Sequence, residues 1–143
     1  MKVVVDANVV LRAFRSRNGA SHRVLRSLLL REFECFASPA VIFEYEDVLK
    51  RPGMLGPSPA FTEGEIDEVL DAICASVTPV LPWFRFRPFL NDPKDDLYVE
   101  CALCGGATVI VTDDKHFRHP AVLAFGLTAM NAADFVSYQR RPR

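Results

Sequence analysis

The sequence lacks a long apolar stretch. No segment approaches the roughly 18 consecutive apolar residues that a membrane-spanning helix needs. The apolar run near the N-terminus is interrupted at Asp6, too early for the apolar region of a secretory signal. We therefore expect a cytoplasmic protein that makes no contact with a membrane.

Excess charge and cysteine are also scarce. The chain of 143 residues has 17 basic and 18 acidic residues, so its net charge is −1, and a nucleic-acid partner would need a local basic surface. The four cysteines are scattered, and a chain of this length can bury a sufficient core without disulfides. No glycine-rich loop follows the first apolar run, which disfavours a dinucleotide-binding fold.

The cysteines raise one metal hypothesis. Cys101 and Cys104 form a C-x-x-C pair, and His116 and His119 follow, so a zinc site has to be considered. However, the histidine spacing is shorter than in zinc fingers, and the cysteines lie within an apolar helical pattern. We therefore interpret these cysteines as buried helix residues.

Apolar strand patterns alternate with amphipathic helix patterns along the whole chain. The predicted strands are 2–6, 34–38, 77–81, 107–112 and 125–130. The predicted helices are 8–14, 21–32, 39–50, one capped by Thr62, 95–103, and one capped by Asn131. This alternation predicts a single α/β domain over residues 1–139 with a mainly parallel five-stranded sheet. Residues 140–143 form a basic tail that we expect to be disordered.

Acidic side chains follow the predicted strands. Asp6 ends the first strand, and Asp113 and Asp114 follow the fourth, so all three are expected at the carboxyl edge of the sheet. Glu44 lies about two turns into the helix after the second strand, and Asp95 opens the helix before the fourth strand. The sequence therefore predicts that four segments converge on one acidic pocket.

Such a pocket needs a compensating cation or proton, because clustered carboxylates repel one another strongly where the dielectric constant is low. Oxygen-only ligands suit Mg²⁺ or Mn²⁺, and either ion can orient and activate water for attack on a phosphate ester. Each acid taken alone could be a helix cap or a solvated surface group. Asp6 is the exception, since a charge at the end of an apolar strand is costly without a role.

Four segments in this order resemble the motifs of PIN domains, over about residues 2–137. The segments are Val4–Val9, Ser38-Pro39 with Phe43–Leu49, Asp92–Val99, and Val109–Phe117. The resemblance implies a three-layer α/β/α domain around a central, mainly parallel five-stranded sheet. The most similar subgroup is the standalone bacterial PIN proteins described as toxin components of toxin–antitoxin pairs.

The resemblance also implies residue roles. It assigns catalysis and metal binding to four acidic positions, which are Asp6, Glu44, Asp95 and Asp114. Asp96 and Asp113 remain alternative ligands beside the third and fourth of these. It further places Asn8 beside the metal and makes Thr112 the hydroxyl that orients the acidic cluster.

The implied activity is that of a Mg²⁺- or Mn²⁺-dependent endoribonuclease that hydrolyses phosphodiester bonds of RNA. The implied partners are RNA, a small antitoxin protein that covers the acidic pocket, and a second copy of the chain. The sequence also has several apolar residues beyond what a three-layer core needs, which favours a homodimer. They are Leu28, Leu29, Val48, Leu49, Met54 and Leu55.

Two groups of side chains are candidates for contact with RNA phosphates. Lys115 and His116 follow the fourth strand. Arg12 and Arg15 lie on the first helix, and for these two a solvated helix face explains the pattern as well as RNA contact does. The segment 83–89 interleaves arginine with aromatic residues. For it we favour core packing or a protein partner over base stacking.

Two other functions remain open. A non-catalytic RNA-binding PIN module would use the same fold, but it would not need the four acids. A phosphotransfer hydrolase could use Asp6 as its nucleophile, but such enzymes have an Asp-x-Asp motif, and Asn8 occupies the second position here.

Overall fold

The centre of the fold is a short strand of valines. The computed structural model describes residues 1–55, 61–82 and 93–141, except for the side chains of residues 93–95. Strand β1 (Lys2–Val5) has three buried valines and pairs in parallel with β2 (Glu34–Ala37) on one side and β4 (Val109–Val111) on the other. Because both faces of β1 are covered, its sequence is a continuous apolar run.

The sheet has five strands in the order β3-β2-β1-β4-β5, and every pairing is parallel. The outer strands are β3 (Thr78–Pro79) and β5 (Thr128–Met130). The predicted α/β architecture with five parallel strands is thus confirmed. All strands point the same way, so the residues that follow β1 and β4 emerge at the same edge.

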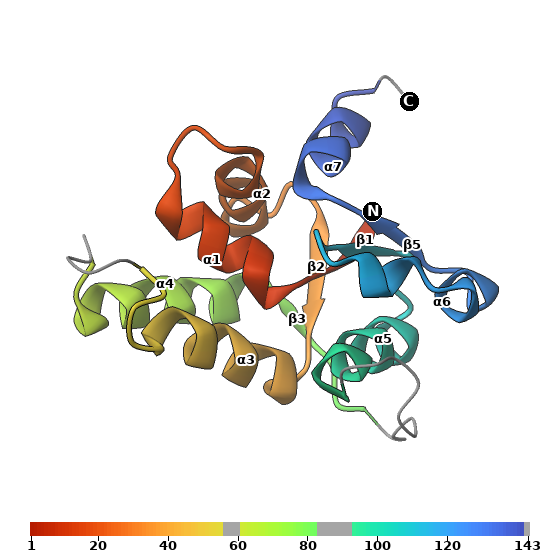
Figure 1. Ribbon diagram of the computed structural model, residues 1–143, viewed down its shortest axis with the longest axis horizontal. Helices are drawn as coiled ribbons and strands as arrows, with labels where there is room; N and C mark the ends of the chain where they lie inside the picture. Colours follow the sequence, from red (N-terminus) through yellow and green to blue (C-terminus); the bar gives the residue numbers. More distant parts are fainter. Residues whose placement is uncertain (56–60, 83–92, 142–143) are drawn as a thin grey trace.

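Helices cover both sides of this sheet (Figure 1). One side carries α1 (Ala7–Arg15), α2 (Ala20–Leu29), α3 (Pro39–Lys50) and α4 (Glu63–Ser76), and the other carries α5 (Pro93–Gly105) and α6 (Pro120–Ala124). Right-handed crossovers require this arrangement, because the chain moves outward from β1 to β3 and then reverses direction towards β5. The last helix, α7 (Ala132–Gln139), packs against α2.

Local capping chemistry sets most helix starts. Ser38 caps α3 ahead of Pro39, Thr62 and Glu65 form the predicted capping box of α4, and Asn131 caps α7. The predicted cap Ser21 is wrong. Helix α2 begins after Gly19, and Ser21 is buried within its first turn.

Other differences concern the ends of elements. Helix α2 stops at Leu29 instead of Glu32, because Arg31 adopts a positive φ of 56° and turns the chain towards β2. Strand β3 has only two residues, and its second is Pro79, which cannot donate a ladder hydrogen bond. The segment between β4 and β5 contains two short elements that the sequence did not predict, a 3₁₀ helix η1 (Lys115–Arg118) and α6.

The apolar residues on which the predicted dimer surface rested belong to the core. Leu28, Val48 and Leu49 are buried, and Leu29, Met54 and Leu55 pack partly buried against the core, so this premise is wrong. The reason is that α1 to α4 pack on one another as well as on the sheet, which buries more than one face of each helix.

The remaining predictions divide by location. Cys101 is buried in α5 as interpreted, and Cys104 beside it is half-buried. Helix α7 ends at Gln139, whereas residues 142–143 of the predicted tail and the aromatic segment 83–89 lie outside the described residues. In the described part of the chain, no helix has both the length and the apolar character needed to cross a membrane.

Candidate active site

Asp6 occupies the junction between β1 and α1. Its backbone N–H donates to the carbonyl of Val111 at 2.9 Å, which fastens the end of β1 to the end of β4. Its carboxylate is only 4% exposed and caps α1, accepting a hydrogen bond from the Asn8 backbone N–H at 3.3 Å. The structure therefore places a buried carboxylate at the carboxyl edge of the sheet, as predicted from the strand ending.

Thr112 connects this carboxylate to the neighbouring strand. The residue directly follows β4 and is buried, and its hydroxyl donates to Asp6 Oδ2 at 2.7 Å. The same oxygen, Oγ1, accepts a hydrogen bond from the Asp114 backbone N–H at 3.0 Å. One hydroxyl thus fixes the position of Asp6 and the backbone turn that presents Asp114.

The two acids after Thr112 have different surroundings. Asp114 caps the 3₁₀ helix η1, and its Oδ1 accepts from the His116 backbone N–H at 2.9 Å. Asp113 instead forms an ion pair with Arg12 of α1. The guanidinium of Arg12 therefore already neutralises Asp113, while Asp114 remains half-exposed at the edge.

These contacts set the pKa of Asp6. Burial is the largest influence and raises this pKa, and the charges of Asp114 and Asp113 raise it further. The hydrogen bonds from Thr112 and Asn8 lower it, but only in part. The ionised carboxylate is consequently under-compensated, and either a proton or a cation would stabilise it.

Two buried tyrosines brace the same junction from opposite sides of the sheet. Tyr45 of α3 donates its hydroxyl hydrogen to the carbonyl of Val5 at 2.5 Å, and the hydroxyl of Tyr98 of α5 accepts from the Ala7 backbone N–H at 3.1 Å. Sequence reasoning missed both residues. The available signal was their position beside predicted ligands, since Tyr45 follows Glu44 directly and Tyr98 follows Asp96 by two residues.

The other predicted acids lie on α3 and α5. Glu44 is half-buried on α3 and lines an open groove of about 610 Å³ with Phe43 and Asp47. Asp96 is buried in α5, and the side chain of Asp95 lies outside the described residues. Within the described ranges, no three acidic, histidine or cysteine side chains lie close enough together to hold a metal ion.

The donor set still has a clear chemical preference. Asp6 and Asp114 present only oxygen atoms, and the charge of Asp114 contributes to the raised pKa of Asp6, so a cation beside them would be stabilising. This chemistry fits a hard ion such as Mg²⁺ or Mn²⁺ better than zinc. A complete coordination shell would need a further donor, and the predicted Asp95 is the candidate whose side chain is not described.

The predicted RNA-contacting residues differ in availability. Lys115 and His116 lie exposed on η1, and His116 Nδ1 is 3.1 Å from Asp114 Oδ1. Arg12 lies beside the acidic edge but pairs with Asp113, and Arg15 donates from Nε to the carbonyl of Met54 at 2.7 Å. Asn8 is exposed on the first turn of α1.

Comparison with known families adds independent information. The model of the PIN domain matches residues 2–116, which extend from β1 into η1 and include every acid discussed above. None of the curated proteins that were compared matches the chain significantly. The matched segment covers most of the chain and contains the Asp6–Thr112–Asp114 arrangement. The chain belongs to the PIN-domain family.

Proposed function

We propose that this protein is an endoribonuclease that hydrolyses phosphodiester bonds of RNA with the help of Mg²⁺ or Mn²⁺. PIN domains are generally nuclease domains and typically use divalent metals. The observation that carries the proposal is the Asp6 carboxylate, which is 4% exposed, has a raised pKa, and is linked through Thr112 to Asp114. A buried carboxylate with acidic neighbours is a common device of catalytic sites.

In this proposal Asp6 and Asp114 hold the metal, together with Asp95 or Asp96 and with Glu44. When bound, the ion would contact phosphate oxygens and lower the pKa of a water molecule. Asp114 is favoured over Asp113 as a ligand, because Arg12 already pairs with Asp113. Asp95 and Asp96 both remain candidates on α5.

The chain's own side chains would orient the acids and the substrate. Thr112 fixes the Asp6 carboxylate, and the two tyrosines hold the backbone on either side of Asp6. Lys115 and His116 are exposed next to Asp114, where a cationic side chain would neutralise a phosphate of the bound RNA. Asn8, exposed on α1, would contribute a polar contact at the same edge.

The proposal includes a biological role as the toxin of a toxin–antitoxin pair in the cytoplasm. Its support is the resemblance to standalone bacterial toxin components. A small antitoxin would bring a basic side chain to the acidic edge and so exclude metal and RNA. Phe43, which is 69% exposed on α3 beside Glu44, offers such a partner an apolar contact. A homodimer remains part of the proposal on the resemblance alone.

One observation favours a second candidate, a PIN module that binds RNA without cutting it. The described residues do not bring three metal ligands together, and a binding module would not need them. The hypothesis of Asp6 as a phosphotransfer nucleophile gains no such support. Both of its carboxylate oxygens accept hydrogen bonds, and the side chain is almost fully buried.

A cleavage assay separates these candidates. The parent protein would be incubated with structured and unstructured RNAs, with and without Mn²⁺, beside Asp6→Asn and Asp114→Asn. Loss of a residue that only supports a metal ligand typically costs roughly 10- to 100-fold in activity. Because Asp6 and Asp114 are proposed as ligands themselves, both substitutions should reduce cleavage by more than this. Asp71→Asn removes the same charge from the exposed face of α4 and should leave activity unchanged. Equal activity in all variants would refute the mechanism, and RNA binding by the parent without any cleavage would favour the binding module.

A further inference from the structure

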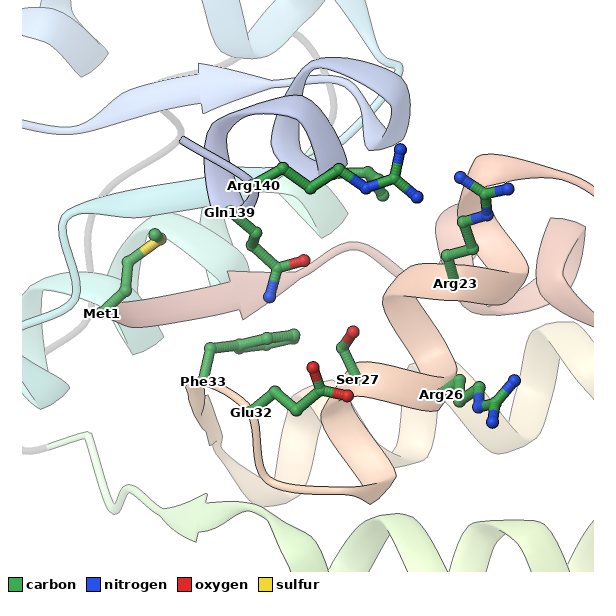
Figure 2. Close-up of a pocket in the computed structure, with 9 residues that line it drawn as sticks. Met1, Arg23, Arg26, Ser27, Glu32, Phe33, Gln139 and Arg140 are labelled. Atoms are coloured by element: carbon green, nitrogen blue, oxygen red, sulfur yellow. The ribbon is translucent and has the colours of Figure 1, made fainter. Parts of the chain in front are cut away.

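A second hollow lies at the opposite edge of the sheet from Asp6. It has a volume of about 480 Å³ and is bounded by α2 and α7. Met1, which precedes β1, and Phe33, which precedes β2, also line it. The pocket therefore lies at the amino edge of the sheet, and none of the proposed catalytic residues lines it. Figure 2 shows its lining.

The lining of this pocket is strongly basic. Helix α2 contributes Arg23 and Arg26, and Arg140 follows the last turn of α7, whereas Glu32 is the single acid of the lining. Such a concentration is notable in a chain whose overall charge is −1. Arg26 and Ser27 lie three and four positions after Arg23, so the three residues share one face of α2, the face that lines the pocket.

The three arginines have no acceptor within the described part of the protein. No hydrogen bond or ion pair joins the guanidinium group of any of them to another described residue. Several other arginines do have acceptors: Arg12 pairs with Asp113, Arg31 donates to the carbonyl of Ala75, and Arg51 pairs with Asp47. A guanidinium has several donors in a planar fork that matches phosphate, and here these donors remain available.

The arrangement of side chains favours an anion with several oxygen atoms. In Figure 2, Arg23 from α2 and Arg140 from α7 extend over the same side of the pocket, and Ser27 and Gln139 point into its middle. Phe33 is only 6% exposed, so its ring closes the floor and does not offer a face for base stacking. These features suit the sugar–phosphate backbone of a nucleic acid better than its bases.

We infer that this pocket is a second binding site for RNA phosphates, which holds the strand whose scissile bond lies at Asp6. The identity of the ligand rests on the proposed function. Met1 and Asp6 flank β1, so the two sites lie roughly 16 Å apart along an extended strand. This straight-line separation is a minimum, because β1 is buried and an RNA has to pass over the surface of the domain to reach both edges of the sheet. An RNA of about 12 nucleotides can therefore contact both sites, and one of about four cannot.

Binding is measured without cleavage, by fluorescence anisotropy of a labelled 12-nucleotide RNA in EDTA. The Arg23→Gln/Arg140→Gln double variant should bind the RNA about 10-fold or more weakly than the parent. The slope of log K against log salt concentration should become shallower by roughly 0.7 for each phosphate contact that is lost. Its effect should be the same for different RNA sequences, because backbone contacts carry no sequence information. Glu32→Gln should strengthen binding, since it removes the only acid of the lining.

Arg17→Gln is the matched control, because it removes an exposed guanidinium that lines neither this pocket nor the groove beside Glu44. Equal affinity of the parent and the double variant would overturn the inference, as would equal affinity for RNAs of about four and 12 nucleotides. Arginine-dependent binding of poly-glutamate in preference to RNA would also overturn it, because the pocket would then serve an acidic protein. Circular dichroism verifies that each variant is folded.

Failure of this inference is distinguishable from failure of the proposed function. If the inference holds and the nuclease proposal fails, RNA binding depends on the arginines although the parent never cleaves RNA. If the nuclease proposal holds and the inference fails, Asp6→Asn abolishes cleavage while the arginine substitutions change neither binding nor KM.

Discussion

The hydroxyl of Thr112 contacts both acids that we assign to the catalytic edge. Thr112→Val keeps the shape of the side chain but removes the donor to Asp6 and the acceptor for the Asp114 N–H. Leaving these buried groups unpaired should lower the free energy of unfolding by about 1–3 kcal/mol. Cleavage of RNA should fall roughly 10- to 100-fold, which is typical of the loss of an outer-shell partner.

The same substitution should change the pH dependence of cleavage. The Thr112 hydrogen bond lowers the pKa of Asp6, so its removal raises a pKa that burial already holds high. The acidic limb of the pH–rate profile should therefore move to higher pH. Thr112→Ser restores the hydroxyl and should restore the parent profile. A Val variant with reduced stability but an unchanged profile would mean that Thr112 supports only the fold.

The cysteines allow a test of burial that does not depend on function. Burial raises the pKa of Cys101 to about 11, and it raises the pKa of Cys35 even more, so both remain thiols at pH 8. Cys74 is exposed on α4. We expect Ellman's reagent to modify Cys74 in the native protein and to reach Cys35 and Cys101 only after denaturation. In Cys74→Ser the fast phase should disappear, apart from any reaction of the half-buried Cys104. Fast reaction of more than one thiol in that variant would contradict the buried positions of Cys35 and Cys101.

At the scale of single residues, the sequence predicts what is unusual for its setting. Asp6 stands out because a charge ends an apolar strand. Thr112, which ends the fourth predicted strand, was assigned only through the resemblance to PIN domains. Tyr45 and Tyr98 do not stand out, because a tyrosine on an apolar helix face resembles any core residue until its hydroxyl partner is known. The pair of Arg12 and Asp113 joins positions 101 residues apart, which no local pattern can indicate.

At the scale of elements, the end of α5 is a point of very close packing. A Cβ added to Gly105 would lie 3.0 Å from side-chain atoms of both Phe36 and Val80. Gly105→Ala should therefore force these side chains apart and lower the free energy of unfolding by about 1–3 kcal/mol.

Gly64→Ala in α4 is the matched control. The nearest atom to its added Cβ is Thr62 Oγ1 at 3.8 Å, so this variant should be as stable as the parent or up to about 1 kcal/mol more stable. Urea denaturation of both variants provides the measurement. Equal stability of the two alanine variants would show that α5 is free to move away from the sheet.

Elements with local start signals were predictable from the sequence. The caps of α3, α4 and α7 are side-chain interactions over three residues, so the sequence contains the whole signal. Elements that depend on tertiary contacts were predicted less well. The predicted strand 77–81 shrinks to Thr78 and Pro79, where the chain meets β2, and α6 was missed because five residues are too few to establish an amphipathic period.

At the scale of the whole molecule, the strand order explains why the acids meet. The chain proceeds outward from β1 to β3 and then returns to place β4 on the other side of β1. In open parallel sheets, ligands bind at the carboxyl edge where the order reverses in this way. The sequence predicted the edge, because each acid follows a strand. The sequence alone could not predict that β1 and β4 are neighbours, because the strand order depends on which helices cover which face of the sheet.

This arrangement predicts opposite effects of Asp6 on stability with and without metal. In the metal-free protein the raised pKa of Asp6 means that its ionised form opposes folding at neutral pH. Asp6→Asn should then melt at the same temperature as the parent or higher, and any gain should shrink as the pH falls towards 3.8, the ordinary pKa of the carboxyl. An Asn side chain can still cap α1.

Mn²⁺ should reverse this order. An ion that binds only the folded parent stabilises it by about 2.7 kcal/mol at 100 times its dissociation constant, which raises Tm by roughly 2–4 °C for each kcal/mol. Asp6→Asn should gain little, because it lacks the most buried of the carboxylates at this edge. Asp71→Asn, an equal loss of charge on the exposed face of α4, should gain as much as the parent. If Mn²⁺ raised Tm equally in all three proteins, the ion would bind away from Asp6. Asp6 would then not belong to a metal-binding catalytic centre.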